Sequence, residues 1–302
     1  MNSYTLDNGK LRAVFLDYGA LIHELWVKDR YGKSINVIQG LSKPEDYIKD
    51  EWYRGAVVGR FAGRLKNPIQ IEGKKVFLKE DEKGILLHSG SKGWSKSCWK
   101  AETEEDKNLI RFKYFCPNGA VGFPGNVHSV VTYFLEDNQL NIIYQASTDA
   151  PTHINLTNHA YFNLSGGKSK DTHQLTVHAD QYLELDSSSI PTGKKLNLEN
   201  TDFDFRKARI LGKKKLDDYF VLNSKTKEAA ILYEKTTGIE MKTYTNQPGI
   251  VIFTPSHFDA ICFETQKFSD TPNIDCFPTT LVKPGEVYEQ RTEFQFNLKN
   301  EG

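Results

Sequence analysis

Short runs in which apolar and polar residues alternate recur along almost the whole of this 302-residue chain. The runs are rich in β-branched and aromatic residues, and Gly, Asn, Asp or Pro separates them, which is typical of half-buried strands. They are residues 11–16, 21–27, 109–115, 127–135, 140–145, 175–179, 229–233, 239–245, 250–254, 260–265 and 292–298. A period of two predicts an all-β protein in which two packed antiparallel sheets bury the alternate side chains.

One segment, residues 42–52, favours a helix instead. Ser42 and Glu45 have the spacing of a capping box, and Pro44 falls in the first turn, where proline is tolerated. We expect this helix to be short and peripheral. No linker, composition step or fixed repeat divides the chain, so we expect residues 1–302 to form a single domain.

Composition and charge argue against several kinds of partner. Lys plus Arg and Asp plus Glu both number 39, and basic clusters such as Lys213-Lys214-Lys215 are short, so nucleic acid is not expected. No stretch is apolar enough to span a bilayer and the N-terminus lacks a signal-peptide pattern, so we expect a cytoplasmic protein without a membrane partner. The four scattered cysteines, with no Cys-x-x-Cys pair, are expected to be free thiols.

The densest polar run is residues 155–166, which read Asn-Leu-Thr-Asn-His-Ala-Tyr-Phe-Asn-Leu-Ser-Gly. Buried amide, hydroxyl and imidazole groups each need a hydrogen-bond partner. The run therefore indicates either a fixed polar pocket around His159 or an internally satisfied junction between a strand and a loop. Because an imidazole can hold or release a proton near neutral pH, His159 is a candidate for acid–base chemistry.

The same run resembles the signature of the aldose 1-epimerases, or galactose mutarotases, which usually reads Asn-x-Thr-Asn-His-Thr/Ala-Tyr-Phe-Asn-Leu followed by a glycine. Residues 58–64, 87–94, 216–220 and 263–266 resemble other segments of that family, in the same order and at similar spacing. The resemblance covers nearly the whole chain. It implies a large antiparallel β-sandwich of the galactose-mutarotase type.

The resemblance also implies an activity, the interconversion of the α and β anomers of free aldoses such as glucose or galactose. Opening the ring requires a base for the proton of the C1 hydroxyl and an acid for the ring oxygen, and needs neither a cofactor nor a metal. The resemblance assigns Glu264 as the base and His159 as the acid. A carboxylate is normally ionised near neutral pH and an imidazole can hold a proton there, so we expect both groups to begin in the required state. On a strand, Glu264 and Gln266 would share a face with Cys262.

Sugar binding falls, by the same resemblance, to Arg64, His88 and Asp217, with His88 also able to help protonate the ring oxygen. Their side chains can donate to, or accept from, hydroxyl and ring oxygens. We expect Arg60, four residues before Arg64, to be structural. Asp218 is the alternative to its neighbour as the binding carboxylate.

Three positions depart from the family pattern. Gly63 stands where Asn is common, Ser89 where glycine is usual, and Tyr219 where many relatives have a small or amide residue. The glycine predicts that one amide contact with the substrate is missing. Trp94 is expected either to stack on the sugar or to lie in the core.

Other functions stay open at this stage. Asp217 and Glu264 could form the carboxylate pair of a glycosidase, the pocket could bind sugar without turning it over, or the substrate could be a hexose 6-phosphate. A metal site is not expected, because the eight histidines show neither His-x-His nor His-Glu-x-x-His spacing. The expected partner is a small monosaccharide bound by a monomer or homodimer, and the preferred aldose cannot be read from the sequence.

Overall fold

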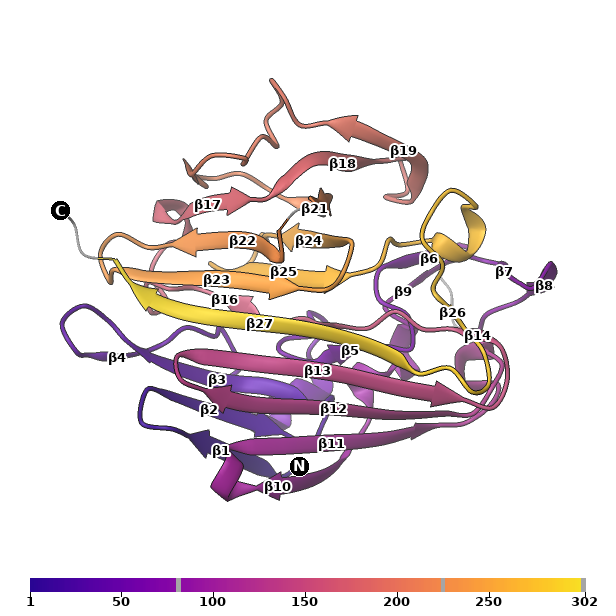
Figure 1. The fold of residues 1–302 in the computed structure, drawn as a ribbon, viewed down its shortest axis with the longest axis horizontal. Coiled ribbons are helices and arrows are strands. Elements are labelled where there is room, and N and C mark those ends of the chain that lie inside the picture. Colours follow the sequence, from indigo (N-terminus) through magenta and orange to yellow (C-terminus); the bar gives the residue numbers. More distant parts are fainter. Residues whose placement is uncertain (80–82, 224–225, 300–302) are drawn as a thin grey trace.

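A computed structural model describes residues 1–79, 83–223 and 226–299, and its largest element is a nine-stranded antiparallel sheet (Figure 1). In spatial order the strands are β10 (Lys100–Glu104), β11 (Leu109–Cys116), β12 (Val127–Glu136), β13 (Gln139–Thr148), β27 (Tyr288–Leu298), β23 (Ile239–Thr245), β22 (Glu228–Tyr233), β17 (Gln174–Val177) and β20 (Arg209–Ile210). The C-terminal β27, yellow in Figure 1, pairs with both β13 and β23. The end of the chain thus joins the two halves of this sheet.

Two smaller antiparallel sheets form the opposing layer. The six-stranded sheet contains, in order, β16 (Tyr161–Phe162), β25 (Ile261–Gln266), β24 (Gly249–Phe253), β21 (Asp217–Leu222), β18 (Ala179–Leu185) and β19 (Pro191–Asn197). The four-stranded sheet contains β1 (Ser3–Asp7), β2 (Leu11–Leu16), β3 (Leu21–Lys28) and β4 (Ser34–Asn36). An isolated bridge between Ile38 and Phe162 connects these two sheets.

Short strand pairs bring the sequence motifs together. The pairs are β5 (Val57–Val58) with β15 (Thr157–Asn158), β6 (Arg64–Lys66) with β9 (Ile85–Leu87), β7 (Ile69–Ile71) with β8 (Lys74–Val76), and β14 (Thr152–His153) with β26 (Leu281–Val282). Pairing of β5 with β15 places the arginine motif beside the histidine run. Pairing of β6 with β9 places Arg64 opposite Leu87, next to His88.

In the part of the chain that the structure describes, the helices are all short 3-10 helices. They are η1 (Pro44–Lys49), η2 (Gly90–Lys92), η3 (Trp94–Lys96), η4 (Glu105–Lys107), η5 (Ala120–Gly122), η6 (Lys170–Thr172) and η7 (Thr271–Asn273). The longest helix among the described residues has six residues, against about 20 apolar residues needed to cross a bilayer.

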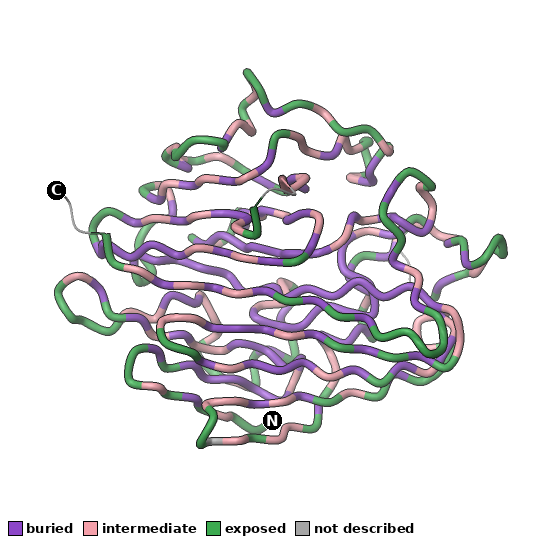
Figure 2. Tube along the Cα trace, in the orientation of Figure 1, coloured by how far each residue is buried: buried purple, intermediate pink, exposed green. Residues whose placement is uncertain are grey.

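The main core lies between the two layers. Phe162 of the six-stranded sheet has its ring centroid 4.8 Å from that of Phe294 on β27, and Phe15 of the four-stranded sheet lies 4.7 Å from Tyr133 on β12. One hydrophobic cluster includes residues of all three sheets. Figure 2 shows that the strands crossing the middle of the molecule are largely buried, whereas turns and outer hairpins are exposed.

The predicted all-β sandwich is confirmed. Ten of the predicted strands coincide with strands of the structure to within a few residues, and the run 175–179 spans the end of β17 and the start of β18. The four cysteines are free thiols, as expected.

The structure confirms a short helix within residues 42–52, but the helix is shorter than predicted and the predicted capping box is wrong. The segment forms only the 3-10 helix η1, which begins after Lys43, and no side chain caps its N-terminus. Tyr47 is its one buried residue. Ile48, next to Tyr47, is 61% exposed, so the fold does not bury an apolar face of this segment, and helices this short are not stable by propensity alone.

Replacing Phe162 by Ala tests the packing of the two layers. We expect the free energy of unfolding to fall by about 3–5 kcal/mol, because the ring is fully buried between Phe263 and Phe294. Urea denaturation measures the change. Phe77→Ala is the control, since that side chain is 69% exposed, and equal losses in the two variants would contradict the assignment of the core.

Candidate active site

His159 lies between β15 and β16, and hydrogen bonds hold the backbone on both sides of it. Its N–H donates to the Ala56 carbonyl at 2.9 Å, and its own carbonyl accepts from the Gly55 N–H at 3.0 Å. The Asn158 side chain donates to the Gly55 carbonyl at 2.8 Å and accepts from the Ala160 N–H at 2.9 Å. The imidazole is thereby held on a fixed backbone.

The remaining amides of the run tie distant loops together. Asn155 donates to the Ala62 carbonyl at 3.3 Å and accepts from the Lys267 N–H at 2.9 Å, while Asn163 donates to the Asp259 carbonyl at 2.7 Å. Both interpretations of the polar run are therefore correct in part. Its amides form a satisfied structural junction, and the histidine between them contacts the polar residues His88 and Glu264.

Glu264 comes from β25, where the predicted alternation holds. Glu264 and Gln266 line the pocket and Cys262 contacts an imidazole nitrogen of His159 at 3.5 Å, whereas Phe263 packs into the main core. The two faces of this strand separate the site from the core, because successive side chains on a strand point in opposite directions.

The central contact of the site joins His159 to Glu264. The Nε2 atom of the imidazole lies 3.5 Å from Oε1 of the carboxyl group, and both side chains are about 5% exposed or less. The His88 ring is perpendicular to that of His159, with centroids 5.3 Å apart. A pocket that is open to solvent is lined by Arg64, His88, Asp217 and Glu264 among others, and His159 adjoins it through its contacts with His88 and Glu264.

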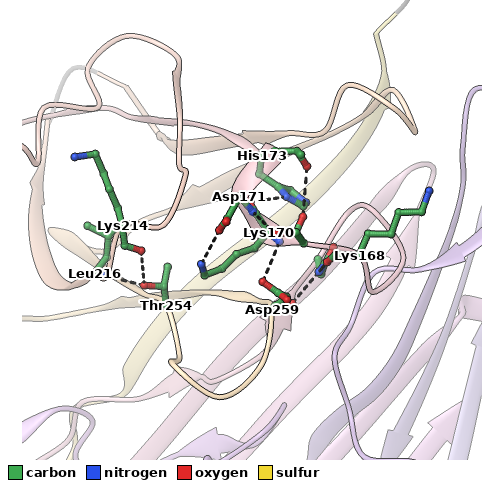
Figure 3. Close-up of polar contacts among 11 residues, drawn as sticks. Lys168, Lys170, Asp171, His173, Lys214, Leu216, Thr254 and Asp259 are labelled. Atoms are coloured by element: carbon green, nitrogen blue, oxygen red, sulfur yellow. Dashed lines mark hydrogen bonds and ion pairs between the residues drawn. The ribbon is translucent and has the colours of Figure 1, made fainter.

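Arg64 and Asp217 face each other across the same pocket. A guanidinium nitrogen of Arg64 lies 3.3 Å from Oδ2 of Asp217, and both side chains are partly exposed. The start of β21 is held by the Thr254 hydroxyl, which accepts from the Leu216 N–H at 2.8 Å and donates to the Lys214 carbonyl at 3.2 Å (Figure 3). The structure thus brings together all five residues that the sequence indicated.

The departures from the family pattern have local explanations. Ser89 has a φ of +64°, a conformation that usually favours glycine, and its buried hydroxyl accepts from the Phe61 N–H at 2.9 Å. Gly63 has a φ of +83°, and a Cβ atom there would lie 2.1 Å from the Ser269 hydroxyl. Ser269 therefore occupies the space that a side chain at position 63 would need.

The positions of Asp218, Tyr219 and Trp94 relative to the pocket distinguish the remaining alternatives from the sequence. Asp218 accepts a hydrogen bond from the Asp217 N–H at 3.1 Å and does not line the pocket. Tyr219 does line it, and its hydroxyl donates to the Gln266 carbonyl at 2.6 Å. Trp94 is 1% exposed and belongs to the main core, so it offers no surface for stacking on a sugar.

Burial sets the protonation of the central pair. It lowers the pKa of the His159 imidazole to about 4, with partial opposition from a hydrogen bond to its own backbone. Burial, and next the charge of Asp217, raise the pKa of Glu264 to about 8 against the opposing effect of Arg64. Burial therefore opposes the expected ionisation of Glu264 at neutral pH in the free site. The favoured state there has a neutral imidazole and a protonated carboxyl group.

The protonation of His88 is fixed by the backbone. The Gly63 N–H donates to its Nδ1 atom at 3.1 Å, so the neutral ring carries its proton on Nε2. Burial, then the charges of His159 and Arg64, hold the pKa of His88 well below its usual value. Its Nε2–H is thus a hydrogen-bond donor.

The tautomer of His88, with its proton on Nε2, disfavours metal binding at this site. Ligand atoms of His88, His159 and Glu264 lie within 4.8 Å of one another, which would suit a small cation. Metal-binding histidines, however, ligate through one nitrogen and donate from the other. In His88 one nitrogen already accepts from the backbone and the other carries the proton, so the three residues do not fit a metal site.

Two residues near the site were assigned no functional role from the sequence. The Tyr53 ring lies 4.9 Å from that of His88 and 5.8 Å from that of His159, and nothing in its sequence neighbourhood indicates this. Gln266 lines the pocket. Its position two residues after Glu264 on a strand was the sequence feature that could have indicated this.

Arg60 is structural, as expected. Its guanidinium is 1% exposed and donates to the carbonyls of Pro124 at 2.7 Å and Gly125 at 3.1 Å, and to the Thr152 hydroxyl at 3.2 Å. It binds two segments of the fold away from the pocket.

Matched substitutions separate the two arginines. We expect Arg60→Met to lower the free energy of unfolding by about 2–4 kcal/mol, because it leaves buried carbonyls unpaired. Arg64→Met should change it by less than about 1 kcal/mol, since a partly exposed ion pair contributes little. Urea denaturation of both variants measures the difference, and a greater loss in Arg64→Met would reverse the assignment.

Comparison with known proteins agrees with this geometry. The family model for aldose 1-epimerase matches residues 2–295. Human galactose mutarotase is 33% identical over 99% of this chain and 94% of its own length, and aldose 1-epimerase of Escherichia coli K12 is 30% identical over 96% and 93%. An aldose epimerase homologue from C. elegans has a similar structure, with a TM-score of 0.92, 29% identity, and coverage of 99% of this chain and 100% of that one. With its fold, its motifs and these relatives, the chain belongs to the aldose 1-epimerase family.

Proposed function

We propose that this protein is an isomerase, an aldose 1-epimerase that interconverts the α and β anomers of a free aldose such as glucose or galactose. The contact between His159 and Glu264, beside a pocket lined by hydrogen-bonding groups, carries the proposal. The names of its relatives support the same reaction and substrate class. Cytoplasmic location and a monomeric or homodimeric state stay predictions from the sequence.

Ring opening requires two proton transfers at neighbouring oxygens. The Glu264 carboxylate takes the proton of the C1 hydroxyl while His159 gives one to the ring oxygen, so the C1–O5 bond breaks and a C1 carbonyl forms. After rotation about C1–C2, the two residues exchange roles. The ring oxygen then attacks the other face of the carbonyl, and the opposite anomer forms.

The buried pair can supply this state without a change in total charge. A neutral imidazole beside a protonated carboxyl group contains the same number of protons as an imidazolium beside a carboxylate. One transfer across the 3.5 Å contact converts the first state into the second. Hydrogen bonds from the C1 hydroxyl to the carboxylate, and from the imidazolium to the ring oxygen, favour the ionised state once sugar is bound. The Nε2–H of His88 is a second donor available to the ring oxygen.

Arg64 and Asp217 are suited to hold sugar hydroxyls, the first as a donor and the second as an acceptor. Their ion pair orients both groups at the pocket wall. The named relatives, which are galactose mutarotases and aldose 1-epimerases, do not favour the glycosidase alternative.

Removing either member of the central pair tests the mechanism. We expect Glu264→Gln and His159→Asn each to lower kcat at least about a hundredfold, the usual contribution of a general acid or base. Polarimetry of freshly dissolved α-glucose and α-galactose measures the rate above the spontaneous one. Circular dichroism and thermal melting confirm that each variant is folded, and a folded variant with the wild-type rate would refute the role of its residue.

The pH profile tests the shared proton. Activity requires the pair to hold one proton, so kcat/KM should be level between about pH 5 and 7.5. It should fall as pH rises through about 8, where the pair loses that proton, and fall again towards pH 4, where it gains a second. Polarimetry corrected for the buffer-catalysed rate gives the profile. A kcat/KM that instead rises through pH 8 would mean that Glu264 acts as a base beside a neutral imidazole.

A further inference from the structure

Gln266 is a fully buried side chain whose amide has no hydrogen-bond partner among the residues that the structure describes. It is 0% exposed, and neither Nε2 nor Oε1 makes a hydrogen bond, although the residue lines the pocket. Gln290, also 0% exposed, differs in this respect. Its Nε2 donates to the Thr265 carbonyl at 2.9 Å, and its Oε1 accepts from the Tyr288 hydroxyl.

An unpaired buried amide destabilises a fold, because no hydrogen bond offsets the loss of its contacts with water. Buried polar groups in native proteins are nearly always satisfied, so each exception requires an explanation. Gln266 shares its strand face with Glu264, whose Oε2 atom is also buried without a partner. The unpaired atoms of both residues are adjacent to one pocket, which indicates a ligand that presents several hydroxyl groups.

Strand geometry places Gln266 at the far side of such a ligand. Residues two apart on a strand are separated by about 6.6 Å, so a pyranose with C1 at Glu264 extends its opposite edge towards Gln266. The Tyr219 hydroxyl fixes the backbone there by donating to the Gln266 carbonyl at 2.6 Å. Ser269 also lines this part of the pocket, in the space left by the absent side chain of Gly63.

We propose that Gln266 is a specificity-determining residue that binds the hydroxyl groups on C3 and C4 of an aldohexopyranose. Its Nε2 donates to one hydroxyl oxygen, and its Oε1 accepts from the neighbouring hydroxyl. An amide can therefore pair with two adjacent hydroxyls at once. The inference rests on the proposed function, since the proposed chemistry at Glu264 places C1.

Gln266→Met tests the proposal, because Met is similar in length and lacks the amide. We expect KM and the dissociation constant for glucose, measured by polarimetry and isothermal titration calorimetry, to rise at least about tenfold. Stability towards urea should be unchanged or higher, because the substitution removes two unpaired buried atoms. The matched control, Gln290→Met, should instead lose stability and keep the wild-type dissociation constant. A less stable Gln266→Met with unchanged sugar affinity would overturn the proposal.

Deoxy sugars identify the hydroxyls. We expect wild-type protein to bind 3-deoxyglucose and 4-deoxyglucose at least about fivefold more weakly than glucose, and Gln266→Met to lose this discrimination. Removing the C2 hydroxyl should affect both proteins equally. Discrimination at C3 and C4 that persists in the variant would assign it to other residues and overturn the proposal. A wild-type protein that binds these sugars but does not accelerate mutarotation would overturn the proposed function alone, because the titrations do not depend on turnover.

Discussion

The site depends on the contact between one imidazole and one carboxyl group, His159 and Glu264, in a place that water scarcely reaches. In water, the carboxyl group would be ionised at neutral pH and the imidazole would be partly protonated. Burial favours the uncharged form of each, so the imidazole becomes less basic and the carboxyl group less acidic. The two changes together leave one proton on the pair, held by the carboxyl group in the free site. A sugar that offers a hydroxyl to one group and a ring oxygen to the other can then determine where that proton lies.

The fold provides this environment by using the two faces of one strand for different purposes. On β25, Phe263 packs into the core between the layers, while Glu264 lies on the opposite face, next to the pocket. The histidine comes from a short connection that is held by amide side chains instead of by a long strand. Asn155 and Asn158 satisfy backbone groups of other loops and so fix the connection in place. The sheet and the amide network are therefore both needed to keep the central distance constant.

Much of this arrangement could be predicted from the sequence, and the exceptions have physical causes. Alternation is a local pattern, so it located most strands and the face that carries Glu264. The extent of the helix at residues 42–52 was not predicted correctly, because a capping pattern specifies where a helix can begin but not whether the fold buries one of its faces. The position of Tyr53 against His88 follows from loops that meet only in three dimensions. The protonation of Glu264 could not be predicted either, since a pKa reports how completely the surrounding chain excludes water.

The unpaired amide of Gln266 extends the same reasoning from catalysis to selectivity. A pocket that held only the reacting groups would treat all pyranoses alike, because every aldose presents the same hemiacetal at C1. Discrimination needs polar atoms at the opposite edge that remain unsatisfied until the correct hydroxyls arrive, since a buried group left unpaired penalises the wrong ligand. Gln266 meets that condition, and the well-bonded Gln290 shows that the fold satisfies a buried glutamine elsewhere. The destabilisation stored at Gln266 in the free protein is thus the physical basis of selectivity in the bound one.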